Sequence, residues 1–216
     1  MKMHVMATAN VAYLDKLLLK GGLVQPVHYE QLRDVPREHL LQWCVKNAVY
    51  QLPTWELIWW LKREIAGRSA IEICAGKSCL GRHLGIPMTD NFMQARPEVA
   101  LYYALMKQPT IIPPDDVIQM EANEAIRHFR PQVVIGAWVS QRRLDENDFS
   151  LDGGNCYGPD EHDILDSGCT YIHIGNEGPH RIKRIRLRPY RELSFPWLMG
   201  RGFQANLNRI WVWDAA

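Results

Sequence analysis

The stretch that decides the predicted fold is IEICAGKSCLGRHLG, residues 71–85. Its apolar start belongs to a strand expected over residues 69–74, and a helix is predicted to begin at Leu80. The small residues Ala75 and Gly76 lie between the two, where they let the backbone approach a ligand closely. Free N–H groups at a helix start favour polar or anionic groups. The stretch therefore predicts the first strand and the ligand loop of an α/β domain.

Strand and helix patterns alternate through the rest of the chain. Apolar runs predict further strands over residues 85–90, 117–120, 132–139, 170–174 and 209–213. Helical patterns lie over residues 80–84, 97–106 and 123–129. The run QVVIGAWV at 132–139 is the clearest strand, because a continuous β-branched run suits a strand buried on both faces. The alternation predicts the α/β class, with a mostly parallel central sheet flanked by helices.

The first 66 residues are expected to form an N-terminal helical cap, and residues 67–216 the main domain. Apolar residues at helical spacing predict helices over residues 11–19, 36–49 and 53–65. The pair Gly21-Gly22 suits a helix end or a hinge. These helices bury one face each, so we expect them to lean on the main domain rather than fold alone.

Composition excludes several classes of protein. Of the 216 residues, 47% are hydrophobic and 23% charged, which excludes a disordered chain, a collagen-like fibre and a disulfide-dense small protein. Lys and Arg number 25 and Asp and Glu 24, so the net charge of +1 gives no global attraction to nucleic acid or an anionic membrane.

Nothing in the sequence predicts a membrane segment or a secretory signal. The most apolar window, residues 52–65, is interrupted by Pro53, Glu56, Lys62 and Arg63, so it is too short and too charged to span a bilayer. The five cysteines are an odd number and are scattered along the chain. We therefore expect a cytoplasmic protein with reduced thiols and no membrane partner.

Two nucleotide-binding motifs are rejected for the loop after the first strand. A P-loop would need glycine five positions before Gly76, where the chain has Ile71. The dinucleotide pattern G-x-G-x-x-G would fall on Cys74, Gly76 and Cys79, so only one of its glycines is present.

The same loop resembles the first motif of the S-adenosylmethionine-dependent methyltransferases with the Rossmann-like fold. That motif has an acidic residue followed by alternating small residues. Glu72 and Gly76 match it, whereas Cys74 and Ser78 stand where the family usually has glycine. The likeness covers roughly residues 67–140, and it implies a Rossmann-like domain that binds S-adenosylmethionine.

The resemblance also implies roles for residues after later strands. The family places an acidic residue at the end of the second strand, where it accepts hydrogen bonds from the ribose hydroxyls, and Asp90 lies eighteen residues after Glu72. An acidic and a small residue beside the adenine match Glu121-Ala122. In that family the fourth strand ends beside the methyl-transfer site, which here implies Ala137 and Trp138. The implied cofactor-binding residues are Glu72, Cys74, Ala75, Gly76, Ser78, Asp90, Asn91, Glu121, Ala122, Ala137 and Trp138.

Some of these residues have plainer interpretations. Asp90 could cap a turn with Asn91, Glu121 could be a first-turn helix charge, and Trp138 could belong to the core.

Candidate catalytic residues follow the acidic segment 141–169. His180 is the best general-base candidate, because histidine titrates near neutrality. Tyr157, Asp160 and Glu161 could meet a substrate above the cofactor, although acids capping the first turn of a helix are the preferred interpretation. No motif for methylating amino groups or cytosine C5 follows the fourth strand.

No metal site is expected, because Cys156, His162, Cys169, His173 and His180 match no zinc spacing. In residues 181–191, Arg184, Arg186 and Arg188 alternate with apolar residues and would share one strand face. Such a face could bind the phosphates of a nucleic acid, but a charged edge strand in solvent is favoured.

The predicted function is transfer of a methyl group from S-adenosylmethionine to an unknown acceptor, small or macromolecular. Two alternatives stay open: a non-catalytic module that binds a nucleotide or a partner on the same fold, and a nicotinamide-dependent oxidoreductase. Cys74 and Ser78 at the glycine positions and the missing catalytic motif favour the first alternative, and the absent glycine pair counts against the second.

Overall fold

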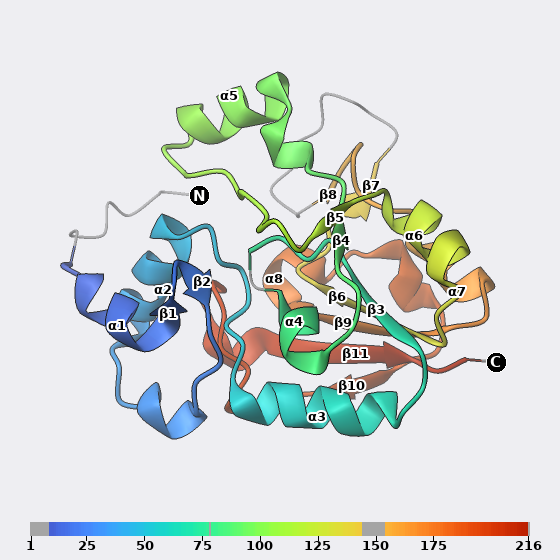
Figure 1. The fold of residues 1–216 in the computed structure, drawn as a ribbon, viewed down its shortest axis with the longest axis horizontal. Helices are drawn as coiled ribbons and strands as arrows, with labels where there is room; N and C mark the ends of the chain where they lie inside the picture. The colour runs from blue at the N-terminus through green and yellow to red at the C-terminus, as the bar shows by residue number, and fades with distance from the viewer. Residues whose placement is uncertain (1–8, 78, 144–153, 216) are drawn as a thin grey trace.

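The chain folds into an α/β structure, seen in a computed structural model that describes residues 9–77, 79–143 and 154–215 (Figure 1). Its centre is a five-stranded sheet in the order β10–β11–β9–β6–β3. The bounds of these strands are Arg191–Leu193 (β10), Asn208–Trp213 (β11), Thr170–Asn176 (β9), Val133–Ala137 (β6) and Ala70–Ile73 (β3).

The sheet is mixed, so the expectation of a mostly parallel sheet is wrong. Strands β3, β6 and β9 run parallel, but β11 runs antiparallel to both of its neighbours. The long segment after β9 returns the chain to the same edge of the sheet, where Asn208 of β11 pairs with Asn176, the last residue of β9. Apolar runs in the sequence carry no record of strand direction, which is set by the path of the connection.

A short parallel ladder lies beside β3. Strands β4 (Thr89–Asp90) and β5 (Ile118–Gln119) pair with each other, and Glu72 of β3 bridges to Met88 in the parallel sense. The backbone N–H of Ala75 also donates to the carbonyl oxygen of Thr89 at 3.0 Å. The parallel strands therefore succeed one another in space as β5, β4, β3, β6 and β9.

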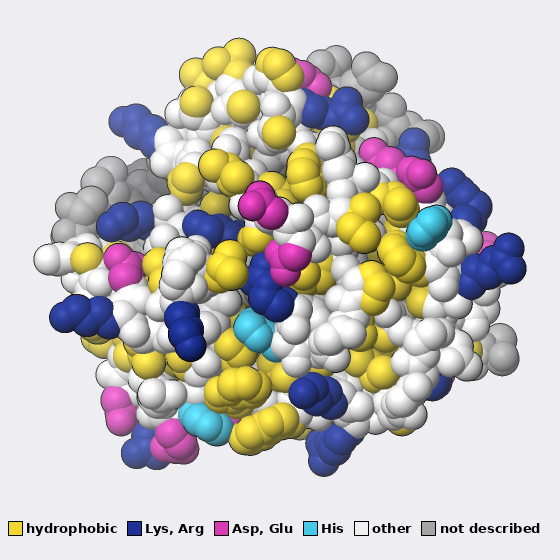
Figure 2. Space-filling model, viewed as in Figure 1, with side chains coloured by type: hydrophobic (Ala, Val, Ile, Leu, Met, Phe, Trp, Pro, Cys, Tyr) yellow, Lys and Arg dark blue, Asp and Glu magenta, His cyan; other side chains and the backbone are white. Residues whose placement is uncertain are grey.

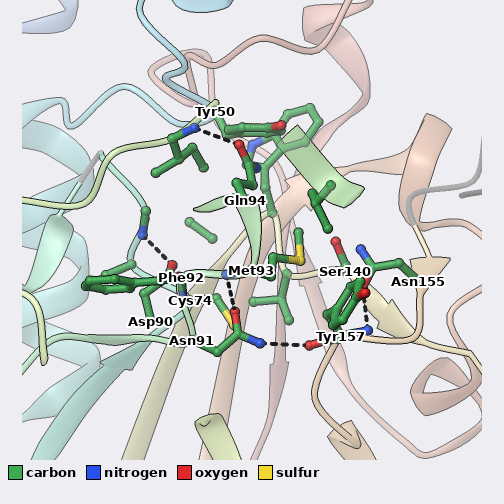
Figure 3. Close-up of a pocket in the computed structure, with 18 of the residues that line it drawn as sticks. Tyr50, Cys74, Asp90, Asn91, Phe92, Met93, Gln94, Ser140, Asn155 and Tyr157 are labelled. Carbon is green, nitrogen blue, oxygen red and sulfur yellow. Dashed lines mark hydrogen bonds between the residues drawn. The ribbon is translucent and has the colours of Figure 1, made fainter. Parts of the chain in front are cut away.

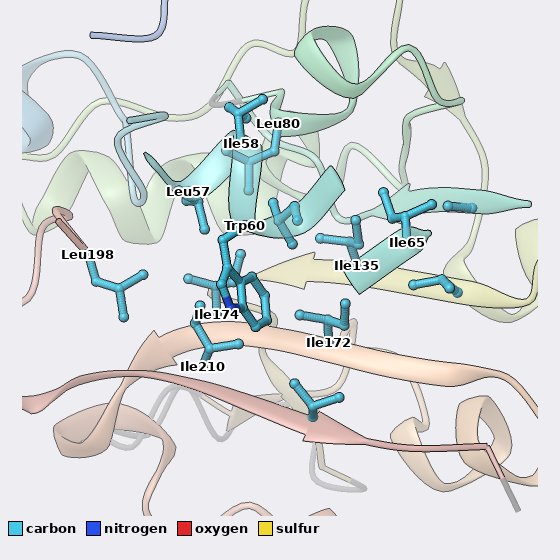
Figure 4. Close-up of a cluster of buried hydrophobic side chains, with 14 residues drawn as sticks. Leu57, Ile58, Trp60, Ile65, Leu80, Ile135, Ile172, Ile174, Leu198 and Ile210 are labelled. Carbon is cyan, nitrogen blue, oxygen red and sulfur yellow. The ribbon is translucent and has the colours of Figure 1, made fainter. Parts of the chain in front are cut away.

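Helices cover both faces of the sheet (Figure 1). Helix α3 (Trp55–Ile65) and α4 (Leu80–Leu84) lie on one face, where Trp60 and Leu57 pack against side chains such as Ile135 and Ile172 (Figure 4). Helices α6 (Ala122–Phe129) and α7 (Glu161–Asp166) share the core on the other face. Adjacent residues of β6 face opposite cores, as the alternation of a strand requires.

The N-terminal part builds a second apolar core. It contains α1 (Asp15–Leu18), the hairpin β1–β2 (Leu19–Lys20 and Leu23–Val24) and α2 (Arg37–Lys46). Gly21 and Gly22 form the two-residue turn of this hairpin, with φ of +59° and +80°. The expected helix end or hinge at these glycines is therefore wrong, because two successive positive φ angles select glycines for a hairpin turn.

The boundary expected at residue 66 stays a prediction. Helix α3 lies on its N-terminal side, yet five of its residues are buried in the core shared with the sheet. The other helices and strands are α5 (Pro97–Leu105), β7 (Gln141–Arg142), β8 (Gly154–Asn155) and α8 (Glu177–His180). Within the described residues, no helix is long and apolar enough to cross a membrane.

The basic stretch does not form a strand over Arg184–Leu187, where the structure has a 3₁₀ helix. Arg186 donates to both carboxylate oxygens of Glu177, at 2.9 and 3.0 Å, and lies 5.2 Å from the ring of Trp211. Arg188 pairs instead with Asp166 at 2.7 Å. The expected shared face is wrong, because these two arginines bind separate partners on different elements.

Candidate functional site

A cavity of about 320 Å³ lies where β3, β4 and β6 end (Figure 3). Each strand is followed by a segment that lines it: residues 74–77 after β3, 90–94 after β4 and 137–140 after β6. The carboxyl ends of neighbouring parallel strands meet at one edge of a sheet, so loops distant in sequence converge there. The volume falls in the range of pockets that bind small molecules, about 300–1,000 Å³.

Asp90 is the carboxylate among the described residues that line the cavity. Its Oδ2 accepts a hydrogen bond from the backbone N–H of Gly76 at 3.0 Å, and its Oδ1 accepts one from Phe92 at 2.8 Å. Burial raises the pKa of this carboxyl above its ordinary value, while the two N–H donors act against that rise. The side chain thus fixes the loop after β3 against the end of β4 (Figure 3).

Asn91 links three segments around the cavity. Its amide nitrogen donates to the carbonyl oxygen of Tyr157 at 3.0 Å, and its Oδ1 accepts from Met93 N–H at 3.1 Å (Figure 3). The same nitrogen donates to Glu121 Oε2 at 3.2 Å. Gln94, further along the same loop, accepts from the backbone N–H of Ile111 at 2.7 Å. These bonds hold the loop after β4 in one conformation.

Aromatic side chains form another wall. The rings of Tyr50 and Trp138 lie 5.9 Å apart, and the Trp138 and His180 rings lie 5.4 Å apart. The hydroxyls of Tyr50 and Tyr103 are 3.0 Å apart. Trp138 has φ of +57°, a strained value for a large side chain, and its backbone N–H donates to Ile174 at 2.7 Å.

Helix α5 lies above the cavity and contributes Val99, Tyr102 and Tyr103 to its lining. Apolar side chains gather over this helix on the face shown in Figure 2. Leu101 and Leu105 are 62% and 73% exposed. Charged side chains of both signs are dispersed over the same face.

Most of the predicted cofactor residues line the cavity. They are Cys74, Ala75, Gly76, Asp90, Asn91, Ala137 and Trp138, together with the predicted base His180. The structure therefore brings these residues together, and their roles stay predictions. Loss of hydration raises the pKa of the Cys74 thiol far above its ordinary value, so this thiol stays protonated.

Glu72 lies beneath the loop and is fully buried. Its carboxylate accepts from the backbone N–H groups of Leu80 and Gly81, at 3.2 and 2.7 Å, at the start of α4. Burial raises the pKa of Glu72 to about 8. Glu72 is not among the described residues that line the cavity. Any contribution of Glu72 to ligand binding would therefore act through the loop between β3 and α4, which its hydrogen bonds hold in place.

Other predicted residues lie beside the cavity. Glu121 and Ala122 line a neighbouring depression, and Glu121 is tied to the cavity by its bond from Asn91. Ser78 lies outside the described residues.

Asp160 and Glu161 are absent from the described lining of the cavity. The Asp160 side chain accepts from His162 N–H at 3.0 Å and caps α7. Glu161 is 5% exposed and pairs with Lys183 Nζ at 2.5 Å, while the Tyr171 hydroxyl donates to it at 2.9 Å. Their catalytic roles stay predictions. The contact of Asp160 matches the expected helix cap, whereas Glu161, in the first turn of α7, binds Lys183 and Tyr171 instead.

His180 is buried at the cavity wall. Its Nδ1 lies 3.0 Å from the backbone nitrogen and 2.9 Å from the carbonyl oxygen of Asn176. Burial and the nearby Lys183 lower the pKa of His180 to about 3, so the ring is neutral at physiological pH. The described residues contain no group of three or more His, Cys, Asp or Glu that could hold a metal ion.

Several lining residues were not predicted from sequence. Tyr50 follows α2, Lys77 follows Gly76, and Arg201 precedes β11, whereas Tyr157 after β8 was expected from the sequence near a substrate. Of the three that were not predicted, only Lys77 has a sequence signal, as the cation next to the loop glycine. The other two reach the cavity through the tertiary fold.

Comparison with known proteins does not identify a family. No family model matches the chain, and no curated protein matches it. Among solved structures the chain is similar to the crystal structure of Thermoplasma acidophilum 1320, with 12% identity over 72% of this chain and 86% of that one and a TM-score of 0.33. A likeness at this TM-score carries no argument about fold or function.

Proposed function

We propose that the cavity binds S-adenosylmethionine and that the protein is a methyltransferase with a Rossmann-like fold. The observation that carries the proposal is the position of the cavity in the strand order. In chain order, the parallel strands β3, β4, β5, β6 and β9 occupy the spatial order 3-2-1-4-5, which is that of doubly wound nucleotide-binding folds. Ligands of such folds bind where the order reverses, between the first and fourth strands, and the loops after β3 and β6 both line the cavity.

The chemistry of Asp90 fits a nucleoside. Each carboxylate oxygen accepts one backbone N–H and has a further lone pair. A ribose offers two hydroxyl donors, which an ionised carboxylate can accept together. Asp90 would therefore hold the ribose, as the sequence resemblance implies.

The loop after β3 suits close approach of a ligand. Gly76 has φ of +55°, and a Cβ there would lie 3.3 Å from Ile111 Cδ1. A side chain at this position would narrow the cavity, whereas glycine leaves its backbone open to the ligand. Cys74, Ala75 and Gly76 would face the amino-acid part of the cofactor.

The bound cofactor would supply an activated methyl group on a sulfonium. The protein then has to orient the acceptor and exclude water, since alignment supplies much of the rate enhancement for such a transfer. Tyr50 and Trp138 form an aromatic wall at the end of β6 that can do both. His180 is in the neutral form that accepts a proton, although its low pKa makes it a weak base.

The test is a thermal shift with S-adenosylmethionine, S-adenosylhomocysteine and NAD in parallel. A ligand that binds only the folded state must raise the melting temperature. We expect shifts with the two sulfur nucleotides and none with NAD. A shift with NAD alone would favour an oxidoreductase, and no shift with any ligand would favour the non-catalytic partner-binding module.

A further inference from the structure

Among the described residues that line the cavity, cations outnumber carboxylates. Its lining includes two permanent cations, Lys77 and Arg201, and one carboxylate, Asp90. Within the part of the chain that the structure describes, neither cation forms an ion pair with a carboxylate. A cation in a cavity of low polarity attracts a negative group from a ligand more strongly than one in water.

Arg201 is held on the aromatic side of the cavity. Its guanidinium carbon lies 4.1 Å from the centre of the Tyr50 ring, and its Nη2 donates to Gln108 Oε1 at 2.9 Å. Its backbone N–H donates to the carbonyl oxygen of Tyr50 at 2.9 Å, which fixes the base of the side chain. Within the described residues, Nε and Nη1 of this guanidinium donate no hydrogen bond, so its planar face of N–H groups retains donors for a bidentate anion.

The two cationic residues belong to different segments of the cavity wall. Lys77 follows the loop glycine, on the side of Asp90, where the amino-acid part of the cofactor would lie. Arg201 stacks on Tyr50, whose ring neighbours Trp138 at 5.9 Å. The carboxylate of the cofactor therefore has a cation of its own, and Arg201 is left for the second ligand.

We propose that Arg201 binds the carboxylate of the methyl acceptor, and that the acceptor is a small planar acid whose ring lies against Tyr50 and Trp138. This inference rests on the proposed function. The aromatic faces suit a flat ring, because offset and edge-on contacts between rings are favourable. A cavity of about 320 Å³ falls in the range of sites for small molecules, so the ligands are expected to be small.

Benzoate and benzamide are the probes of this inference. They have nearly the same shape, but only benzoate carries a charge. We expect benzoate to bind the wild-type protein saturated with S-adenosylhomocysteine at least about tenfold more tightly than benzamide, as a charge-assisted bidentate contact implies. Equal affinities, or no binding of either probe, would overturn the inference without any substitution in the protein.

Arg201→Gln tests whether Arg201 binds the carboxylate of the acceptor or that of the cofactor. Arg188→Gln is the matched control, because Arg188 pairs with Asp166 outside the cavity. We expect Arg201→Gln to remove the preference for benzoate and to leave the affinities for S-adenosylhomocysteine and 5′-methylthioadenosine unchanged. A loss of affinity for S-adenosylhomocysteine but not for 5′-methylthioadenosine, which lacks the amino-acid part, would assign Arg201 to the cofactor and overturn the inference.

Arg201→Lys is a control for a folding defect, because lysine keeps the positive charge and lacks only the planar pair of N–H donors. It should retain part of the preference for benzoate, and the same affinity as Arg201→Gln would count against a charge effect. Failure of the proposed function has a different signature: neither adenosine compound would bind the wild-type protein, whatever the result with benzoate.

Discussion

Glu161 and Lys183 form an ion pair whose loss has a calculable cost. The two side chains are 5% and 3% exposed, and Nζ lies 2.6 and 2.5 Å from the two carboxylate oxygens. Removing one partner of a buried pair costs about 3–5 kcal/mol, because the other charge is left without compensation. Glu161→Gln also weakens the acceptor of the Tyr171 hydroxyl. We therefore expect a loss of roughly 3–5 kcal/mol in the free energy of unfolding.

The assay is denaturant unfolding at pH 7, with Asp160→Asn as the control. Asp160 is the neighbouring acid and caps α7, and asparagine is an equally good cap, so the control should lose under about 1 kcal/mol. Adding Lys183→Met to Glu161→Gln should restore part of the lost stability, because no buried charge then remains. Equal, small effects of Glu161→Gln and Asp160→Asn would refute the structural role of the pair. Loss of ligand affinity in folded Glu161→Gln would instead support the predicted catalytic role.

Three further substitutions test other parts of the structure. Burial raises the pKa of Glu72 from about 4.5 to about 8, so its contribution to folding stability is largest below pH 4.5 and is lost as the pH rises to 8. Glu72→Gln should therefore flatten the decline in unfolding free energy that urea unfolding measures from about pH 5 to 8. Parallel profiles of the two proteins would contradict this. Gly158→Ala places a Cβ in steric conflict with the carbonyl oxygen of Ser140, and we expect a loss of about 1–3 kcal/mol in denaturant unfolding. Unchanged stability would show that the loop adjusts without cost. Thr54→Ala removes the cap of α3 and the bond to Trp197, and should cost about 1–2 kcal/mol by thermal unfolding, whereas Thr54→Ser should keep most of it.

Sequence patterns predicted the fold best where one local rule applies. The β-branched run at 132–139 contains β6, and Pro97 begins α5 as expected. The direction of β11 and the 3₁₀ helix over Arg184–Leu187 were not predictable, because each depends on contacts between distant segments. The turn at Gly21-Gly22 has a local signal, since two glycines between short apolar runs also suit a hairpin.

Some residues of the candidate site could likewise be predicted from sequence and others could not. The loop after β3 and Asp90 after β4 could be placed from sequence, because the carboxyl ends of successive parallel strands converge. Tyr50 and Arg201 could not be placed at the site from sequence, because Tyr50 precedes β3 and Arg201 follows β10. The fold brings them together through a backbone hydrogen bond and the stacking of the guanidinium on the ring. Burial of Glu161 with Lys183 was likewise hidden, because the two residues are paired only by the fold.

The central claim is that Asp90 holds the ribose of an adenosine cofactor. The most direct test is calorimetric titration of S-adenosylhomocysteine into the wild-type protein, Asp90→Asn and the control Asp166→Asn, whose side chain is exposed and pairs with Arg188. Loss of a charge-assisted contact predicts that Asp90→Asn weakens binding by about tenfold to a hundredfold, while Asp166→Asn binds as the wild type does. Equal affinity of Asp90→Asn and the wild-type protein, or no binding to the wild-type protein at all, would contradict the claim.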